Sequence, residues 1–183
     1  GEAAGFVSAN IHSPISGTVT AVDDFSNGQG LRLTMVAIKR EGDEWMENID
    51  RTAEHKRECT LTPAEIVQKI KAAGIVGLGG AQFPTHVKLS IPDGQKVDTL
   101  IINGVECEPY LTSDYRDMGG RAEMMLTGVE ILMRALGVER AVIGVENNKP
   151  DAIEHLNKVI ARDSYRGIEV MPLQMRYPQG GEK

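Results

Sequence analysis

Residues 74–88 read Gly74-Ile-Val-Gly-Leu-Gly-Gly-Ala-Gln-Phe-Pro-Thr-His-Val-Lys88, and this stretch decides how the rest of the chain is interpreted. Four of its first seven residues are glycine. Glycine allows positive φ angles and lets a flat or anionic ligand reach the backbone without meeting a Cβ atom. A helical pattern precedes the stretch and a strand pattern follows it, which is the setting where α/β domains hold phosphate-bearing ligands. The stretch therefore predicts a ligand-binding loop in an α/β domain.

The segment before this loop has the signature of a short helix. Residues 62–65 form a capping box with proline at the first helical position. Ile66 and Ile70 then lie one helical turn apart, and Gly74 ends the pattern after about Ala73. We expect a helix that presents one apolar face and delivers the chain into the glycine loop.

Strand and helix patterns alternate after the loop. Apolar runs at 97–102, 141–145 and 168–171 predict strands, and helical periodicity at 119–136 and from Pro150 onward predicts the helices between them. Strands that alternate with helices indicate βαβ units, a mainly parallel sheet and right-handed crossovers. The fold class expected is α/β.

The N-terminal part has a different pattern. Runs rich in β-branched residues at 6–11, 17–22 and 31–38 are separated by turn signals, which predicts a small antiparallel barrel or sandwich. A charged, aperiodic segment at 51–60 follows as a linker.

These two regimes predict two domains. A β-rich, barrel-sandwich-like domain is expected over 1–58, followed by an α/β domain over 59–183. Because the sequence starts at Gly1 without methionine and ends in a loop at Lys183, we expect the α/β domain to be truncated at its C-terminus.

Composition excludes several classes of protein. The net charge of −6 disfavours a nucleic-acid binder, and no run approaches the roughly 18–20 apolar residues that span a bilayer. Cys59 and Cys107 have no metal-binding spacing. Two cysteines also cannot supply the four ligands that an iron–sulfur cluster normally takes. No metal ligands are therefore predicted.

Polar side chains follow each predicted strand. Asn103, Glu106 and Glu108 follow the first strand, 146–149 follow the second, and 177–182 come after the third. Asn103 and Gly104 alone are equally typical of an ordinary turn. Since the carboxyl ends of parallel strands meet at one edge, we expect these segments and the glycine loop to line one crevice.

The same segments carry a resemblance to a known family. Residues 77–88 together with 102–109 closely resemble RnfC, a component of the Rnf electron transport complex, and 144–150 and 177–183 are similar to it as well. The chain is more distantly similar to the NADH-binding flavoprotein subunit of respiratory complex I. The resemblance covers nearly the whole chain and implies a Rossmann-like domain that binds FMN and NADH.

The resemblance implies a role for individual residues. In the complex I relatives the glycine-rich loop and the following lysine hold FMN, which points to Gly77, Gly79, Gly80 and Lys88. The aromatic residue of that loop helps to bind NADH, which points to Phe83. Contacts from two further segments correspond to Asn103, Glu106, Glu108, Tyr177, Gly180 and Glu182.

No catalytic side chain is predicted, because hydride transfer to a flavin needs no protein acid. His86 is the best placed of the four histidines, but a lone loop histidine is more often structural, so it is not assigned to the site. Two positions depart from the family pattern: Gln82 replaces a glycine and Val105 replaces an aspartate.

The resemblance also implies a function. The chain would be an NADH-dependent flavoprotein module that passes electrons to two 4Fe-4S clusters, expected only in the missing C-terminal part, and indirectly to ferredoxin. Its partners would be the other subunits of an Rnf-type membrane complex. The location implied is peripheral, on the cytoplasmic face of the bacterial inner membrane, with no membrane span of its own.

Two alternatives remain open. The chain could be a non-catalytic docking or assembly domain with a degraded flavin pocket, which Gln82 and Val105 favour. It could also be a soluble relative of the flavin-dependent cobalamin reductases. Residues 13–19 are similar to biotinyl- and lipoyl-type domains, but no lysine stands in the expected hairpin tip at 24–29, so a carrier role is disfavoured.

Overall fold

A computed structural model of the chain describes residues 1–47, 49–52, 55–79, 81–106, 108 and 110–176. The chain divides into two compact units, one made of Gly1–Glu2 with Ile11–Glu54 and the other of Ala3–Asn10 with His55–Lys183. The domain boundary after residue 58 stays a prediction.

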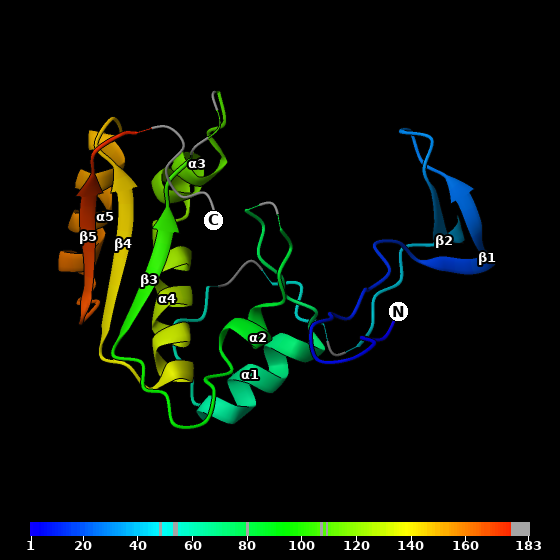
Figure 1. Cartoon of the computed structure of the whole chain (residues 1–183), viewed down its shortest axis with the longest axis horizontal. Helices are drawn as coiled ribbons and strands as arrows, with labels where there is room; N and C mark the ends of the chain where they lie inside the picture. The colour runs from blue at the N-terminus through cyan, green and yellow to red at the C-terminus, as the bar shows by residue number, and fades with distance from the viewer. Residues whose placement is uncertain (48, 53–54, 80, 107, 109, 177–183) are drawn as a thin grey trace. The chain divides into compact units, whose positions relative to one another are not determined.

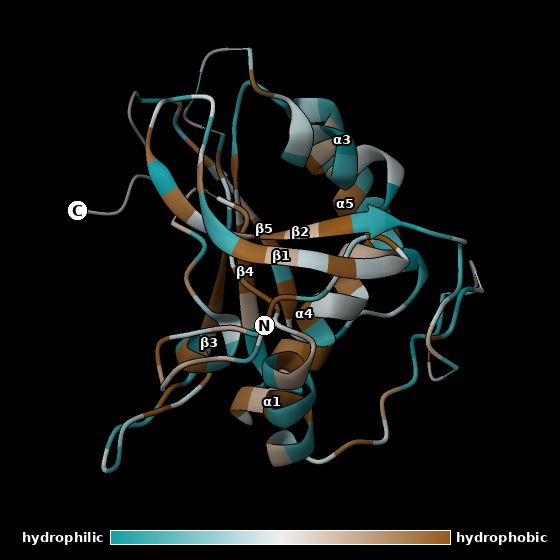
Figure 2. Cartoon of the chain, turned by 90° about the vertical axis from the view of Figure 1, so that its right-hand side faces the viewer, coloured by the Kyte–Doolittle hydropathy of each residue, from teal (hydrophilic) through white to brown (hydrophobic). Residues whose placement is uncertain are grey.

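The first unit contains one β-hairpin. Strands β1 (Gly17–Ser26) and β2 (Arg32–Arg40) pair antiparallel, with a bulge between Val19 and Ala21. Both strands mix apolar and polar residues (Figure 2), with a continuous apolar run at 35–38 in β2. The two strands agree with those predicted at 17–22 and 31–38. The turn is closed by Asn27, whose side-chain oxygen accepts hydrogen bonds from two backbone N–H groups of the same turn.

The strand predicted at 6–11 is wrong, because this segment forms no strand in the structure. Its residues up to Asn10 belong to the second unit. There the Asn10 side-chain amide donates a hydrogen bond to the Ala72 carbonyl at 3.1 Å. The segment thus forms hydrogen bonds within this unit instead of pairing with a partner strand. Its β-branched composition alone did not reveal the absence of a partner strand.

The second unit is built on a parallel three-stranded sheet, as expected. Strands β3 (Thr99–Gly104), β4 (Arg140–Glu146) and β5 (Ile168–Leu173) lie side by side in that order (Figure 1). Helices α4 (Ala122–Leu136) and α5 (Pro150–Arg162) are the crossovers between these strands and pack against the sheet. The α/β prediction is confirmed.

The helix predicted over 119–136 corresponds to α4, and a separate helix that was not predicted precedes it. Helix α3 (Ser113–Gly120) ends at a Gly-Gly pair, and α4 begins at Ala122. Glycine has low helix propensity, and Arg121 between the two helices has φ −136° and ψ 29°, outside the helical region. The break turns the chain so that α3 lies next to the exit of β3.

The main core lies between the sheet and helices α4 and α5. Leu126 of α4, Ile143 of β4 and Leu156 of α5 are fully buried there. These side chains fix the two helices on the sheet and so fix the positions of the strand ends, where the predicted site residues lie.

A smaller core holds the helix that precedes the glycine loop. Helix α1 (Pro63–Ala72) starts with the predicted capping box, in which Thr62 and Glu65 bond reciprocally. Ile66 and Ile70 are buried against a cluster that includes residues of α4. This packing anchors the start of the loop.

The glycine loop runs between α1 and the short helix α2 (Thr85–Lys88) and is closed by backbone pairing. Val76 and Pro84 form a bridge, the Gly77 N–H donates to the Phe83 carbonyl at 2.9 Å, and Thr85 donates to Ile75 at 3.0 Å. The two arms of the loop are therefore held together by backbone hydrogen bonds, as in a hairpin.

Candidate functional site

The glycine loop and the end of β3 face each other across a hollow of about 660 Å³. Among the residues that line it are five with a predicted role: Gly77, Gly79, Phe83, Lys88 and Asn103. Apolar side chains of β3 and α4 complete the walls. The hollow is within the size range typical of ligand pockets.

A second hollow of about 510 Å³ adjoins the first and extends toward α3. The two share Leu78, Gly79, Ile102 and Asn103. Glu108, which also has a predicted role, lines the second hollow together with acidic residues of α3. We call the two hollows together the cleft. One end is apolar with a lysine, and the other end is acidic.

The backbone of the glycine loop is open toward the cleft. A Cβ atom at Gly77 would lie 2.8 Å from the Lys88 ammonium nitrogen, so glycine at this position lets the cation lie close to the loop. A Cβ atom at Gly79 would meet no protein atom within 4 Å. No carboxylate in the described part of the chain pairs with Lys88. The exposed Lys88 ammonium, next to backbone that no side chain covers, is suited to binding an anionic group.

Gln82 adopts a conformation that suits the glycine of the family pattern. Its φ is +51°, in the left-handed region that L-residues other than glycine disfavour. Gln82 also lines the cleft. The substitution therefore keeps the loop path and adds a side chain at the wall of the cleft.

We expect Gln82→Gly to leave the free energy of unfolding unchanged or to raise it by up to about 1 kcal/mol. Gln82→Val should lower it by about 1 kcal/mol, because a β-branched residue fits the left-handed region poorly. Urea denaturation of the two variants and the parent protein measures both effects. A valine variant more stable than the glycine variant would contradict the backbone assignment.

Glu106 lies in a buried ion cluster instead of lining the cleft. Lys149 at the start of α5 places its ammonium nitrogen 2.6 Å from Glu106 Oε2 and 3.0 Å from Glu146 Oε2. The three side chains are only 2% (Glu106), 12% (Lys149) and 6% (Glu146) exposed. A direct contact between Glu106 and a cofactor stays a prediction.

Two pKa values respond to this cluster. Burial alone would lower the pKa of Lys149, but hydrogen bonds to Glu106 and Glu146 outweigh it and raise that pKa. The pKa of Asp114 in α3 is raised, first by burial and then by the nearby Glu106 charge. The Lys149 side chain is therefore positively charged at neutral pH, and the carboxylates of Glu106 and Glu146 surround it.

Sequence reasoning missed the partners in this cluster. Glu146 and Lys149 were expected at the crevice only as part of a strand exit, and Asp114 was not singled out. The spacing of three between Glu146 and Lys149, at the junction of a strand and a helix opened by Pro150, was the available signal. The predicted meeting of the first and second strand exits does occur, through the Glu106–Lys149 pair.

The remaining predicted residues are Gly80, Tyr177, Gly180 and Glu182, and they lie outside the described residues. Val105, which departs from the family pattern, is buried at 8% exposure. His86 is also buried, with its Nε2 atom 3.1 Å from the Phe6 carbonyl oxygen, so its hydrogen bond is with the N-terminal segment.

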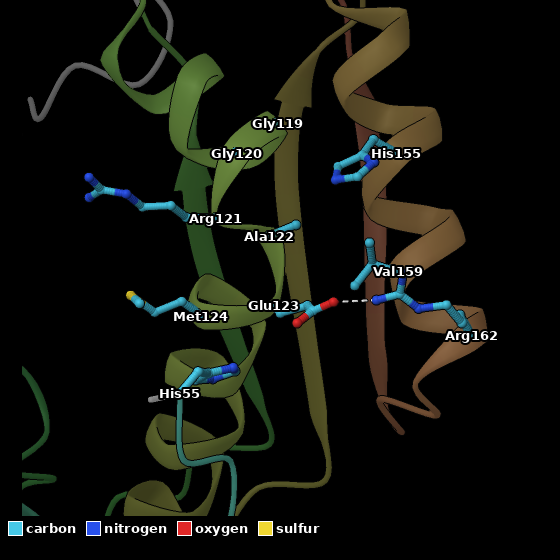
Figure 3. Close-up of a pocket in the computed structure, with 10 residues that line it drawn as sticks. All are labelled: His55, Gly119, Gly120, Arg121, Ala122, Glu123, Met124, His155, Val159 and Arg162. Carbon is cyan, nitrogen blue, oxygen red and sulfur yellow. Dashed lines mark hydrogen bonds and ion pairs between the residues drawn. The ribbon is translucent and has the colours of Figure 1, made fainter. Parts of the chain in front are cut away.

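A separate cavity of about 390 Å³ lies where α4 begins, beside α5 (Figure 3). Its lining includes two exposed histidines, His55 and His155, and the ion-paired Glu123 and Arg162. None of the predicted residues that the structure describes lines it. Within the described ranges, no group of three or more His, Cys, Asp or Glu residues could hold a metal ion. No described helix has the length and apolar character needed to cross a bilayer.

Two family models match the chain. The Nuo51 FMN-binding domain matches residues 70–183, which contain the glycine loop, the sheet and the cleft. The RnfC barrel sandwich hybrid domain matches residues 1–43, which contain the hairpin of the first unit. The predicted order of a barrel-sandwich domain followed by an α/β domain is confirmed.

Two curated relatives are similar over almost the whole chain. The C subunit of a Na⁺-translocating ferredoxin:NAD⁺ oxidoreductase complex from Acetobacterium woodii is 46% identical over 100% of this chain and 40% of that protein. The C subunit of a proton-translocating ferredoxin:NAD⁺ oxidoreductase complex from Clostridium ljungdahlii is 44% identical over 97% of this chain and 38% of that protein. The chain thus spans about two fifths of the length of these relatives.

A solved structure of an NAD⁺-reducing [NiFe]-hydrogenase in the H₂-reduced state is also similar, with 25% identity and a TM-score of 0.48. The alignment covers 60% of this chain and 21% of the hydrogenase chain. The sequence matches are the stronger finding. They establish that the chain belongs to the family of the Nuo51 FMN-binding domain, in the form that carries an RnfC barrel sandwich hybrid domain ahead of it.

Proposed function

We propose that the cleft binds FMN and NADH, and that the chain is the electron-entry module of an ion-translocating ferredoxin:NAD⁺ oxidoreductase. The observation that carries this proposal is the Lys88 ammonium, which pairs with no described carboxylate and lies beside the open backbone of the glycine loop, in a cleft whose other end is acidic. The match to the Nuo51 FMN-binding domain and the names of the two relatives support it.

The residues present fit a flavin mononucleotide. Lys88 and the backbone at Gly79 would hold the phosphate, since cations and unblocked backbone N–H groups are the usual partners of phosphate. Gly77, whose N–H is bonded to the Phe83 carbonyl, would contribute by leaving room for the Lys88 ammonium. Phe83 is partly exposed at the cleft and offers an aromatic face to a flat ring. At the acidic end of the cleft, away from the phosphate, the Asn103 amide would donate or accept hydrogen bonds and the Glu108 carboxylate would accept them.

Bound FMN would supply the chemistry of accepting a hydride as two electrons and releasing the electrons singly. The chain's own part is to bind and orient the two ligands and to exclude water with the apolar walls of β3 and α4. None of the described side chains is assigned a proton transfer, in keeping with the prediction of no catalytic residue.

The partners follow from the same proposal. The chain would sit at the cytoplasmic face of the membrane as a peripheral subunit and pass electrons to two 4Fe-4S clusters held outside residues 1–183, and then toward ferredoxin. The two relatives translocate different ions according to their names, Na⁺ and protons, so no coupling ion is proposed.

A non-catalytic docking role is the second candidate. Two observations favour it: the Gln82 residue occupies the wall of the cleft, and the Glu106 carboxylate is already engaged by Lys149. A protein of this kind would keep the fold and take up no flavin.

Lys88→Met is expected to weaken FMN binding about 10- to 100-fold, because a hydrogen bond to a charged group contributes about 1.5–3 kcal/mol. The measurement is a titration followed by flavin fluorescence, with the protein expressed from its whole reading frame. Lys71→Met, an exposed lysine on α1 outside the cleft, is the matched control and should bind like the parent. Equal affinity in all three proteins would remove Lys88 from the site.

A further inference from the structure

One glutamate forms hydrogen bonds at both ends of the loop between β3 and α3, of which the structure describes residues 105, 106, 108 and 110–112. The Glu106 backbone N–H donates to Glu146 Oε2 at 3.3 Å, at the start of the loop. The Glu106 carboxylate oxygen Oε1 accepts a hydrogen bond from the Asp114 backbone N–H at 2.8 Å, just past the end of the loop. Glu106 thus contributes a hydrogen bond at the start of the loop and another just past its end, and we call these two hydrogen bonds the anchors.

The side chains that reach the cleft from this loop lie between the two anchors. Glu108 and Leu111 line the cleft, and the Leu111 N–H donates to the Glu108 carbonyl at 3.2 Å. Ser113 and Asp114 follow at the start of α3 and line it as well. A movement of either anchor would displace this whole wall of the cleft.

The Lys149 ammonium compensates the charges of the two carboxylates that form the anchors. Glu106 and Glu146 are both carboxylates, are both almost fully buried, and meet at one ammonium group. Without that cation the two charges would repel each other and lack compensation for their lost hydration. The Lys149 ammonium therefore ties the exit of β3 to the exit of β4 and the start of α5.

We propose that the Lys149–Glu106–Glu146 cluster is a positioning device that holds the 105–112 loop, and with it Glu108, at the wall of the cleft. The inference rests on the proposed function where cofactor binding is concerned. It assigns Glu106 an indirect role: its carboxylate acts through the loop and through Asp114 instead of touching the ligand.

The first test needs no ligand. Hydrogen exchange of the Glu106 and Asp114 backbone amides is expected to be slow in the parent protein and about tenfold or more faster in Lys149→Met. Lys149→Arg keeps the charge and should restore most of the protection. Lys158→Met is the matched control, because Lys158 forms an exposed pair with Glu154 on the same helix, and it should leave both amides unchanged.

The second test measures FMN affinity in the protein expressed from its whole reading frame. Lys149→Met should weaken binding about 10- to 100-fold, the range typical of groups that orient a ligand-binding residue. In a double-mutant cycle, Glu108→Gln should cost clearly less affinity in the Lys149→Met protein than in the parent, because Glu108 is already displaced there. A merely structural role for Lys149 would leave the two losses additive.

Glu106→Gln covers the case in which Lys149→Met does not fold. Glutamine keeps an oxygen that can accept from the Asp114 N–H, so this variant should fold and show a smaller rise in exchange. Unchanged exchange at Asp114 in Glu106→Gln, or in Lys149→Met where that variant folds, would overturn the positioning role. A parent protein that takes up no FMN, but in which Lys149→Met does speed exchange, would overturn the proposed function and leave the positioning role supported.

Discussion

Replacing Lys149 with methionine is expected to lower the free energy of unfolding of the second unit by about 3–5 kcal/mol at neutral pH. The variant leaves Glu106 and Glu146 buried and close to each other with no cation between them. Removing one partner of a buried ion pair is more costly than removing the whole pair, since the other charge stays in a place that water does not reach. Urea denaturation measures the change.

The pH dependence of this effect has a defined sign. The pKa of Lys149 is raised in the folded protein, so its contribution to stability is complete below the unfolded value of about 10.4 and is lost as pH rises through the higher folded value. The difference between parent and Lys149→Met should thus hold from pH 7 to about pH 10 and shrink above that. The groups that face Lys149 are Glu106, Glu146, Asp114 and Tyr115.

The control for this prediction is Lys158→Met, which removes an exposed ion pair from the same helix and should cause no measurable change. The double variant Glu106→Gln with Lys149→Met should be more stable than Lys149→Met alone, because it removes one of the two uncompensated charges and with it their mutual repulsion. A Lys149→Met protein as stable as the parent would show that the cluster does not hold the two strand exits together.

Truncating Leu126 to alanine is the second large effect, an expected loss of about 3–4 kcal/mol in the free energy of unfolding. Leu126 is fully buried on the face of α4 that packs against the sheet. The loss combines the transfer of the missing methyl groups with the cavity left behind, since the core between the sheet and helices α4 and α5 relaxes only in part.

Met124→Ala is the matched control, because Met124 is on the same helix and 55% exposed. Its substitution should change the free energy of unfolding by no more than about 0.5 kcal/mol. Similar losses for the two variants would mean that α4 is not packed on the sheet as described.

The elements of the second unit could be predicted because their signals are local. Each signal is contained in one short stretch of sequence. Examples are the capping box at Thr62, the apolar run of each strand and the helical periodicity of α4. Helix α3 was missed, because its 8 residues end in two glycines and include too few apolar residues to show a helical period.

The strand expected at 6–11 failed for a different reason. Strand formation requires a partner strand, and the sequence of this segment does not say whether one is available. In the structure its hydrogen bonds go to α1 and to His86 instead.

The part of the candidate site that could be predicted consists of residues that belong to a glycine-rich loop or to a recognisable sequence motif. Glycine at 77 and 79, Lys88, Asn103 and Glu108 meet at one cleft, as the strand-exit argument expected. Which carboxylate faces the cleft could not be read from the sequence, because Glu106 and Glu108 belong to the same short motif. The choice depends on Lys149, 43 residues away, which draws Glu106 into the ion cluster.

An FMN titration of the protein expressed from its whole reading frame, followed by anaerobic addition of NADH, tests whether the cleft is an FMN- and NADH-binding site. We expect one FMN bound per chain, with quenched flavin fluorescence, and loss of the visible absorbance of oxidised flavin when NADH is added. A folded protein that takes up no FMN, or whose bound FMN is not reduced by NADH, would contradict this proposal.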